Sequence, residues 1–357
     1  MLKSITIENF RCFEQIKIDG FRRINLIGGK NNAGKTALLE ALLLYFYPTP
    51  TAVMSLKQAR KESMTAIKNM PKMAWNTFFY DQDIHQHIKI KGDTDDKNAQ
   101  EVTLSVSLSL DSKVFEDEEE EFVEFIHKNI GRNSPVISVL QIRLLSNQDE
   151  TIKRNVVASS REVFSPSFPD ENIPLISTSL SFSNQEIASQ YDKLNFENQS
   201  DDVLNILKIL DNSIEDAETF SMNEPTLYLT RKDQKRLPIS LFGDAINRVT
   251  AIALELLNRD QNVLFIDEIE NGIHYTSQEK FWKALFQLAR ELDTTIFATT
   301  HSLEMIKAFA AASQDYPEDG MYFELARNPR DQKIVAIKRD AELLEYALER
   351  GKPIRGE

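Results

Sequence analysis

Eight consecutive residues near the N-terminus have the types and the spacing of a loop that binds phosphate groups. They run from Gly29 to Thr36 as GKNNAGKT and fit the pattern G-x-x-x-x-G-K-[ST]. Glycines let such a loop wrap phosphates with its backbone N–H groups inward, and the following helix N-terminus adds positive charge. Lys35 is expected to place its charge on the β- and γ-phosphates, and Thr36 to offer a hydroxyl to Mg²⁺. The nucleotide-binding residues expected here are Asn31, Asn32, Ala33, Gly34, Lys35, Thr36 and Ala37.

Two acidic residues, Asp267 and Glu268, follow directly after the apolar run Val263–Ile266. Such a run is typical of a buried strand, and ligands bind at the carboxyl ends of strands in parallel α/β sheets. We expect Asp267 to hold Mg²⁺, directly or through water, and Glu268 to orient and polarise the attacking water. Alone, the pair could equally be a solvated acidic turn, but the phosphate loop favours the catalytic interpretation.

A third strand, predicted over Thr295–Thr299, runs into His301 and Ser302. A histidine at that end of a strand, beside the two other sites, can donate a hydrogen bond to the γ-phosphate and detect its loss. Ser302 has the residue type that caps helices, and a helix is predicted over Leu303–Ala312. Both roles are compatible, so we expect Ser302 to cap that helix and His301 to act as the sensor.

Alternating strands and helices are predicted to position these residues. The apolar strands are Ile24–Ile27, Val263–Ile266 and Thr295–Thr299, and amphipathic or apolar helices are predicted at Ala37–Phe46, Asp244–Leu257, Glu279–Leu292 and Asp340–Arg350. Late strands are predicted at Met321–Leu325 and Ile334–Ile337. This alternation predicts a parallel sheet covered by helices, which is an α/β fold of the P-loop NTPase type.

The middle of the chain does not follow this alternation. It contains a polar helix predicted over Ser55–Met70, a strictly alternating strand at Val102–Leu110 and the acidic run Glu116–Glu121. We therefore expect residues 1–50 and 224–357 to build one α/β domain, and residues 51–223 to be an α+β insertion, an arm or lid.

Composition excludes several classes of protein. Hydrophobic residues make up 41% of the 357 residues, which rules out wholesale disorder. The formal net charge of −13 repels nucleic-acid backbones on average, so a nucleic-acid partner would need a local basic patch. The single cysteine, Cys12, excludes an intrachain disulfide and zinc sites with two or more thiolates. No apolar run approaches the ~18 residues of a membrane span, and no signal-peptide core is present, so we expect a cytoplasmic protein without a membrane partner.

Together these residues resemble those of ABC-type ATPases of the RecF, SMC and OLD (overcoming lysogenization defect) kind. The most similar members are stand-alone OLD-like proteins, described as AAA-family ATP-binding proteins. The resemblance rests on the phosphate loop with its paired asparagines and on the Asp267-Glu268 strand end. It also rests on the opening ITIENFRCF at residues 5–13, on ATTHS at residues 298–302 and on the tail ALERGKPIR at residues 347–355. It covers residues 1–50 and 220–357 approximately.

The resemblance implies an ABC ATPase head with ATP and Mg²⁺ as cofactors. It also implies a signature loop, which in ABC ATPases faces the nucleotide of the other subunit; the matching residues here are Ser240 and Gly243, before the helix at 245–257. This turn departs from LSGGQ, the common sequence of the signature loop. A bulky residue replaces one of the two glycines, and the spacing between the serine and the remaining glycine is shifted. The resemblance also implies that Arg11 reaches the nucleotide phosphates. The alternative is that its side chain is simply solvated. Asn271 and His274 fall where this family has the D-loop, which crosses the dimer seam.

The function implied is an ATPase that dimerises around two ATP molecules, and in which hydrolysis loosens the dimer and moves the inserted arm. OLD proteins proper carry a C-terminal Toprim nuclease, and the residues after His301 are too few for that domain. Stand-alone relatives commonly work beside a separate effector, often in bacterial defence against phage. We therefore expect a sensor or scaffold ATPase, a homodimer unit or higher oligomer, that controls a partner effector protein.

Two other functions stay open. One is a DNA-repair or DNA-maintenance ATPase of RecF or SMC type, which would bind DNA through basic residues of the inserted segment: Lys57, Arg60, Lys61, Lys68 and Lys72. A solvated helix face is the alternative for these residues. The other is a nucleotide-gated structural oligomer with negligible turnover.

Overall fold

The structure, a computed structural model, describes residues 1–94, 99–108, 137–147, 149–165, 173–176, 183–221, 224–258, 262–351 and 354. The acidic run Glu116–Glu121 lies outside these ranges. The chain forms two compact units. Unit 1 comprises residues 1–20, 36–173 and 327–336, and unit 2 comprises residues 21–35, 174–326 and 337–357. The three-part division at residues 50 and 223 stays a prediction.

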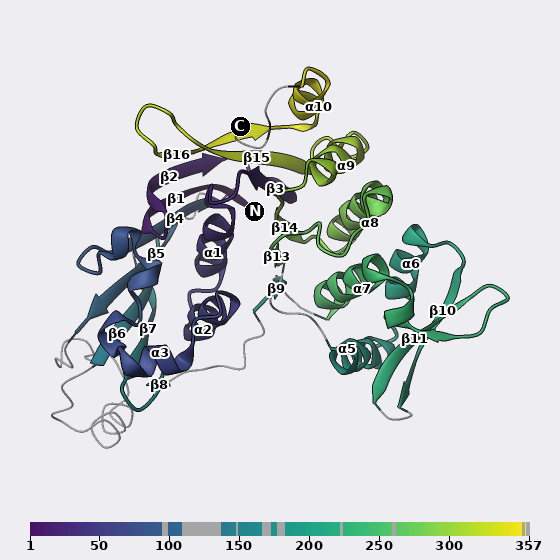
Figure 1. Cartoon of the computed structure of the whole chain (residues 1–357), viewed down its shortest axis with the longest axis horizontal. Coiled ribbons are helices and arrows are strands. Elements are labelled where there is room, and N and C mark those ends of the chain that lie inside the picture. Colours follow the sequence, from purple (N-terminus) through teal and green to yellow (C-terminus); the bar gives the residue numbers. More distant parts are fainter. Residues whose placement is uncertain are drawn as a thin grey trace. The chain divides into compact units, whose positions relative to one another are not determined.

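Unit 1 contains a seven-stranded antiparallel sheet in the order β2-β1-β4-β5-β6-β7-β8. Alternate side chains of β2 and β4 are buried, as in a sheet with one face against a core. Helices α1 and α2 lie beside this sheet (Figure 1). The strands are β1 (Leu2–Phe10), β2 (Phe13–Asp19), β4 (Ile88–Thr94), β5 (Ala99–Ser107), β6 (Ile137–Ser146), β7 (Asp149–Ser159) and β8 (Val163–Phe164), and the helices are α1 (Lys35–Phe46), α2 (Pro50–Ala59) and α3 (Met64–Asn69).

The single polar helix predicted over Ser55–Met70 is wrong. Two helices occupy this segment, because Thr49 caps α2 with Pro50 in its first turn, Lys61 adopts a left-handed φ of 56°, and Ser63 caps α3. The prediction that Lys57 could lie on a solvated helix face is also wrong. Lys57 is 1% exposed, and its Nζ pairs with Glu62 at 2.6 Å.

The parallel strands of unit 2 belong to a six-stranded sheet in the order β16-β15-β3-β14-β13-β9, in which the pairs from β15 to β9 are parallel. The parallel sheet expected from the strand-helix alternation is thereby confirmed. Strands β3 and β13 are buried along their whole length, as the apolar sequences predict. The strands are β3 (Ile24–Gly29), β9 (Leu175–Ile176), β13 (Val263–Ile266), β14 (Thr295–Thr299), β15 (Gly320–Arg327) and β16 (Ile334–Arg339).

Helices α7 to α10 accompany this sheet, and a smaller layer of two helices and three strands belongs to the same unit (Figure 1). The helices are α5 (Asn184–Phe196), α6 (Ser200–Leu210), α7 (Asp244–Leu257), α8 (Gln278–Glu291), α9 (Leu303–Ser313) and α10 (Ala341–Glu349), and the small sheet is β10 (Ile214–Ser221), β11 (Pro225–Arg231) and β12 (Leu237–Pro238). Short 3₁₀ turns lie at Pro71–Met73, Asn76–Phe78, Tyr80–Gln82, Ile239–Leu241 and Tyr275–Ser277.

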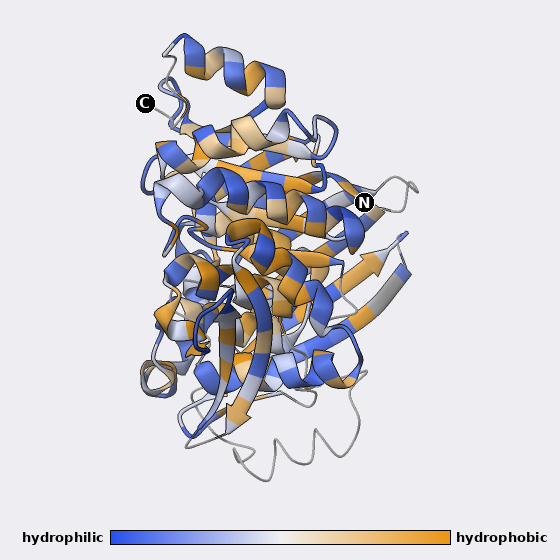
Figure 2. Ribbon diagram, turned by 90° about the vertical axis from the view of Figure 1, so that its right-hand side faces the viewer, coloured by the Kyte–Doolittle hydropathy of each residue, from blue (hydrophilic) through white to orange (hydrophobic). Residues whose placement is uncertain are grey.

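The core of unit 2 lies between the parallel strands and helices α7, α8 and α9. Hydrophobic residues alternate with hydrophilic ones along these helices (Figure 2), so each buries one face. The core includes Leu26, Leu264, Ile296, Ile252, Trp282 and Phe309. In the part of the chain that the structure describes, no helix combines the length and hydropathy that crossing a bilayer requires.

The register of the parallel strands determines where the site lies. Ile27 of β3 is level with Thr299 of β14, and Ala298 of β14 is level with Ile266 of β13. The three neighbouring strands therefore end at one edge of the sheet. This edge carries the phosphate loop after β3, the histidine after β14 and the acidic pair after β13.

Candidate nucleotide-binding and catalytic site

The predicted phosphate loop leaves β3 and enters α1 through backbone conformations that favour glycine. Gly29 has a φ of 148° and Gly34 a φ of 98°, and Asn32 between them is also left-handed at 64°. An added Cβ at Gly29 would lie 2.5 Å from the carbonyl oxygen of Leu325, so only glycine fits there. Asn31 and Asn32 are exposed, whereas Ala33 and Ala37 are buried. Thr36 follows Lys35 in the first turn of α1.

Lys35 turns its ammonium group back onto the loop. Its Nζ donates to the carbonyl oxygens of Gly29 at 2.8 Å and Lys30 at 2.9 Å. Burial lowers the pKa of Lys35, and nearby carboxylates, Glu270 foremost, oppose this effect without cancelling it. A partly buried ammonium gains from an anion beside it, and the helix N-terminus favours an anion as well. The loop therefore fits the phosphates of a nucleotide.

Thr299, the last residue of β14, holds the acidic pair that follows β13. Its Oγ1 donates to Asp267 Oδ1 at 2.5 Å and accepts the backbone N–H of Glu268 at 2.8 Å. The second bond supports Glu268 at a left-handed φ of 49°, which is uncommon for a residue with a side chain. Asn271 Nδ2 donates to Glu268 Oε2 at 2.9 Å. These oriented carboxylates suit a hard cation such as Mg²⁺ and can accept a hydrogen bond from a water molecule.

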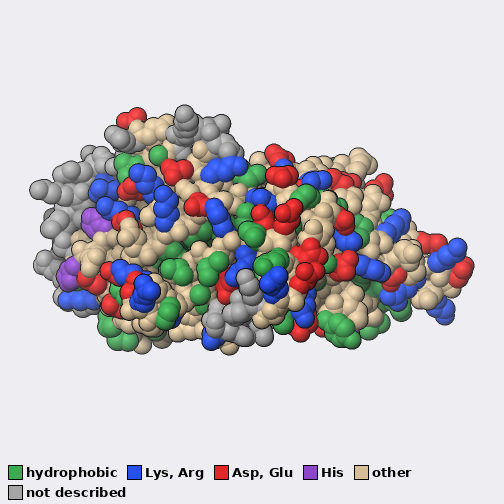
Figure 3. All heavy atoms as spheres, turned by 90° about the horizontal axis from the view of Figure 1, so that it is seen from above, with side chains coloured by type: hydrophobic (Ala, Val, Ile, Leu, Met, Phe, Trp, Pro, Cys, Tyr) green, Lys and Arg blue, Asp and Glu red, His purple; other side chains and the backbone are tan. Residues whose placement is uncertain are grey.

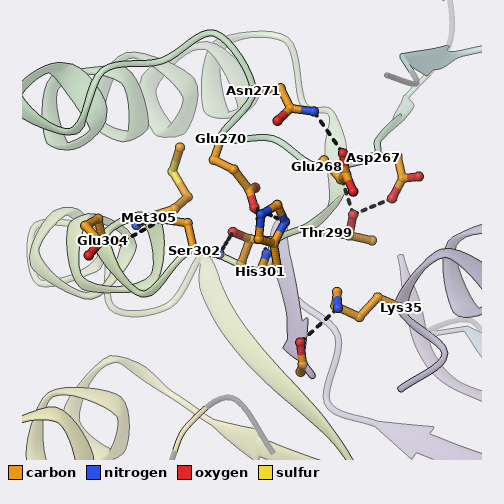
Figure 4. Close-up of polar contacts among 12 residues, drawn as sticks. Lys35, Asp267, Glu268, Glu270, Asn271, Thr299, His301, Ser302, Glu304 and Met305 are labelled. Atoms are coloured by element: carbon orange, nitrogen blue, oxygen red, sulfur yellow. Dashed lines mark hydrogen bonds and ion pairs between the residues drawn. The ribbon is translucent and has the colours of Figure 1, made fainter. Parts of the chain in front are cut away.

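His301 lies beside the same strand end, and Glu270 holds it. The Oε1 atom of Glu270 accepts the backbone N–H of His301 at 2.7 Å and lies 2.8 Å from its Nδ1 (Figure 4). The His301 side chain is 51% exposed, so the ring reaches the surface of the site. Ser302 caps α9 by accepting the N–H of Met305 at 3.2 Å, which confirms the expected cap.

Arg248 extends from α7 to the acidic strand end. Its Nη2 lies 3.5 Å from the backbone carbonyl oxygen of Asp267, at the limit of a hydrogen bond. Burial lowers the pKa of Arg248, while Asp267 and Glu270 act to raise it. A half-buried arginine on this helix therefore adds positive charge beside the carboxylates.

The predicted signature residues lie in the exposed turn before α7. Gly243 occupies the N-cap position with a φ of 88°, and its carbonyl oxygen accepts a hydrogen bond from Asn247 Nδ2 at 2.8 Å. No atom lies within 4 Å of an added Cβ, so this backbone faces open space. Ser240 is exposed in the preceding 3₁₀ turn. Their contact with a nucleotide of another subunit stays a prediction.

Arg11 lies in unit 1 and is only 10% exposed, so the alternative of a solvated arginine is wrong. Its Nε donates to Glu40 Oε2 at 2.9 Å and its Nη1 to the carbonyl oxygen of Thr77 at 2.7 Å. The guanidinium also lies 4.4 Å from the ring centroid of Phe78. Its expected contact with nucleotide phosphates stays a prediction.

Sequence reasoning missed Thr299, Glu270 and Arg248 as members of this site. A signal exists for two of them, because Thr299 ends a predicted strand and Glu270 stands three residues after Asp267. Arg248 gives no such signal, since its proximity to Asp267 depends on how α7 packs on the sheet.

The fold is that of SMC ATPase heads. A solved SMC head bound to the C-winged helix domain of ScpA superposes with a TM-score of 0.52 at 10% identity, covering 96% of this chain and 98% of that chain. This confirms the predicted α/β fold of the P-loop NTPase class.

The family described as "AAA domain, putative AbiEii toxin, Type IV TA system" matches residues 24–307, which is more than half of the chain. The chain belongs to this AAA-domain family and has the fold of SMC heads. An "ATP/GTP phosphatase" of Helicobacter pylori (strain ATCC 700392 / 26695) is 24% identical over 380 residues, covering 98% of each chain. A shorter stretch of 54 residues is 44% identical to the DNA double-strand break repair Rad50 ATPase of Archaeoglobus fulgidus, covering 15% of this chain and 6% of that protein.

Proposed function

We propose that this chain binds and hydrolyses ATP with Mg²⁺ at the edge formed by β3, β14 and β13, and that it is an ABC-type enzyme. One observation carries the proposal: Lys35, the acidic pair Asp267-Glu268 and His301 surround the ends of three neighbouring strands, although Lys35 is more than two hundred residues from the others in sequence. Such convergence of a lysine, two carboxylates and a histidine serves phosphoryl transfer.

Each group of the chain has a distinct part in this mechanism. Lys35 and the N–H groups of the loop bind the β- and γ-phosphates, and Thr36 with Asp267 holds the cation. Bound Mg²⁺ neutralises phosphate charge and polarises the γ-phosphate. Glu268 orients a water molecule and takes its proton, and His301 donates a hydrogen bond to the γ-phosphate. Catalysis consists chiefly of positioning and charge stabilisation.

The turn at Ser240 and Gly243 would complete the site of a second subunit. Its exposed backbone and the N-terminus of α7 can meet the γ-phosphate of a nucleotide bound by a partner related by a two-fold axis. ATP then joins two subunits, and hydrolysis releases them. Arg11 would contact the phosphates of the nucleotide that its own subunit binds.

The partner regulated by this switch is a separate effector protein, and the setting is bacterial defence against phage in the cytoplasm. Three observations support this part of the proposal. The family description names a toxin of a toxin–antitoxin system, the net charge of −13 suits a protein partner better than DNA, and the tail at residues 347–355 resembles that of stand-alone OLD-like proteins.

The ATPase is tested by steady-state hydrolysis and nucleotide binding of Lys35→Ala, with the exposed Lys280→Ala as the matched control. Lys35→Ala should lose tight ATP binding and turnover, and Lys280→Ala should keep both. If both variants hydrolyse ATP like the parent, the site is elsewhere. If the parent binds ATP without turnover, the structural-oligomer alternative is favoured.

The effector is tested by co-expressing the chain with the product of its neighbouring gene. Co-purification that depends on ATP and disappears in Lys35→Ala supports the proposal that this chain holds an effector protein under nucleotide control. Co-purification that survives loss of nucleotide binding contradicts nucleotide control.

A DNA-maintenance ATPase is the second candidate, favoured by the local similarity to Rad50. Its expected basic face is smaller than the sequence predicts, because Lys57 is buried and Arg60 pairs with Glu40 at 2.6 Å. On the face shown in Figure 3, basic and acidic side chains are interspersed. Salt-dependent DNA affinity that disappears when Arg60, Lys61 and Lys72 are neutralised would favour this candidate.

A further inference from the structure

Glu270 is a buried carboxylate for which the mechanism above has no role. Its side chain is 9% exposed. One oxygen, Oε1, meets both the backbone N–H and the Nδ1 of His301, at 2.7 and 2.8 Å. The other, Oε2, is buried and has no hydrogen-bond partner among the described residues. A buried carboxylate with half of its acceptors unused is costly to keep, so its position calls for a function.

The charge of Glu270 acts on two cations of the site. It raises the pKa of Lys35 more than Asp267 or Glu268 does. It also acts to raise the pKa of Arg248, which reaches the same strand end from α7. Glu270 therefore interacts electrostatically with Lys35 of α1 and Arg248 of α7, and it binds His301 after β14.

We propose that Glu270 is a positioning residue for His301 and sets the ring nitrogen that faces the phosphate; this inference rests on the proposed ATPase function. A carboxylate only accepts hydrogen bonds, so Nδ1 of His301 carries a proton. The nitrogen left for the phosphate is Nε2, which donates when the ring carries both protons. Because the same oxygen also binds the His301 backbone, one side chain fixes both the main chain and the ring.

The three acidic residues after β13 therefore have two different roles. Asp267 and Glu268 act on the cation and the water, whereas the hydrogen bonds of Glu270 go to His301. We therefore predict that removing Glu270 has most of its effect only while His301 is present.

The direct test is the tautomer of His301, read from ¹⁵N-histidine NMR of the full-length protein, with its signals identified by their loss in His301→Asn. The parent should show Nδ1 protonated. Glu270→Ala should lose this preference, and Glu270→Gln should keep it, because an amide oxygen still accepts from Nδ1. Glu304→Gln is the matched control, since Glu304 is a carboxylate at the same helix start and accepts a hydrogen bond from Ser302. An unchanged tautomer in Glu270→Ala would overturn the proposal.

Kinetics give the second readout. Glu270→Ala should lower kcat for ATP by about 10- to 100-fold, as loss of an orienting partner does in comparable sites, with a smaller change in KM. Glu270→Gln should recover part of this loss. In the His301→Ala background, Glu270→Ala should have a much smaller effect, and an equal loss in both backgrounds would contradict the proposal. Should the parent lack ATPase activity, the proposed function fails, while the NMR experiment still decides the role of Glu270.

Discussion

Thr299 is the residue that joins the two carboxylates of the site. Its hydroxyl donates to Asp267 and accepts the backbone N–H of Glu268, and its side chain is 1% exposed. Thr299→Val keeps the shape but leaves that N–H without an acceptor, so the free energy of unfolding should fall by about 1–3 kcal/mol. ATP turnover should fall as well, because the left-handed backbone at Glu268 loses its support.

Thr299→Ser is the control for this prediction, since it keeps the hydroxyl. Urea unfolding and steady-state ATP hydrolysis measure the two effects. Equal stability and equal turnover of Thr299→Val and the parent would show that the hydroxyl does not orient the acidic pair.

At the scale of elements, β3 depends on a glycine that faces an aromatic ring. An added Cβ at Gly28 would lie 2.1 Å from the hydroxyl of Tyr322, which itself bonds the carbonyl oxygen of Ile354. Gly28→Ala should therefore displace Tyr322 and destabilise the protein by about 1–3 kcal/mol, measured by urea unfolding. In a double-mutant cycle, Tyr322→Phe should couple to Gly28→Ala by more than ~0.5 kcal/mol. Additive effects would show that the two residues do not share this space.

The ion pair between Glu62 and Lys57, in the segment that follows α1, should make the stability of the protein depend on pH. Burial acts to raise the pKa of Glu62, but the hydrogen bond and charge of Lys57, with help from Thr77 and Arg11, outweigh it, so the pKa lies below its ordinary value of 4.5. The unfolded chain therefore binds the proton more readily than the native state. The stabilisation is present above pH 4.5 and is lost as pH falls through the native pKa.

Urea unfolding at pH 7 and at pH 4 tests this prediction. Glu62→Gln should be less stable than the parent at pH 7 and should lose less stability on acidification. The exposed Glu318→Gln serves as the control and should behave like the parent. Equal losses in Glu62→Gln and the parent would exclude this pair as a source of the pH dependence.

Local sequence patterns predicted the elements of unit 2 well, because their signals are short-range. The strands Val263–Ile266 and Thr295–Thr299 and the helix Asp244–Leu257 have the predicted bounds. The contact of Glu270 with His301 joins residues after two different strands, so no local pattern contains it. The burial of Lys57 likewise depends on Glu62 and on the ring of Trp75, 5.6 Å away. Helix α5 was missed because its polar sequence has a weak apolar pattern.

For the whole molecule, we predict dimers that depend on ATP. Glu268→Gln with Mg-ATP should elute at twice the monomer mass in size-exclusion chromatography with light scattering, and at monomer mass without nucleotide. Adding Gly243→Ala should reduce the dimer, because its φ of 88° strains any residue with a Cβ. Gly351→Ala is the matched control, since Gly351 is also left-handed and open. Monomers in Mg-ATP would contradict dimerisation through this site.

The most direct test of the central claim is ATP turnover by Glu268→Gln, measured beside ATP binding by the same preparation. The variant keeps the shape of the side chain but cannot take a proton from water. We expect undiminished ATP binding and a loss of turnover of about 100-fold or more. Hydrolysis at the parent rate by a variant that binds ATP normally would contradict the claim.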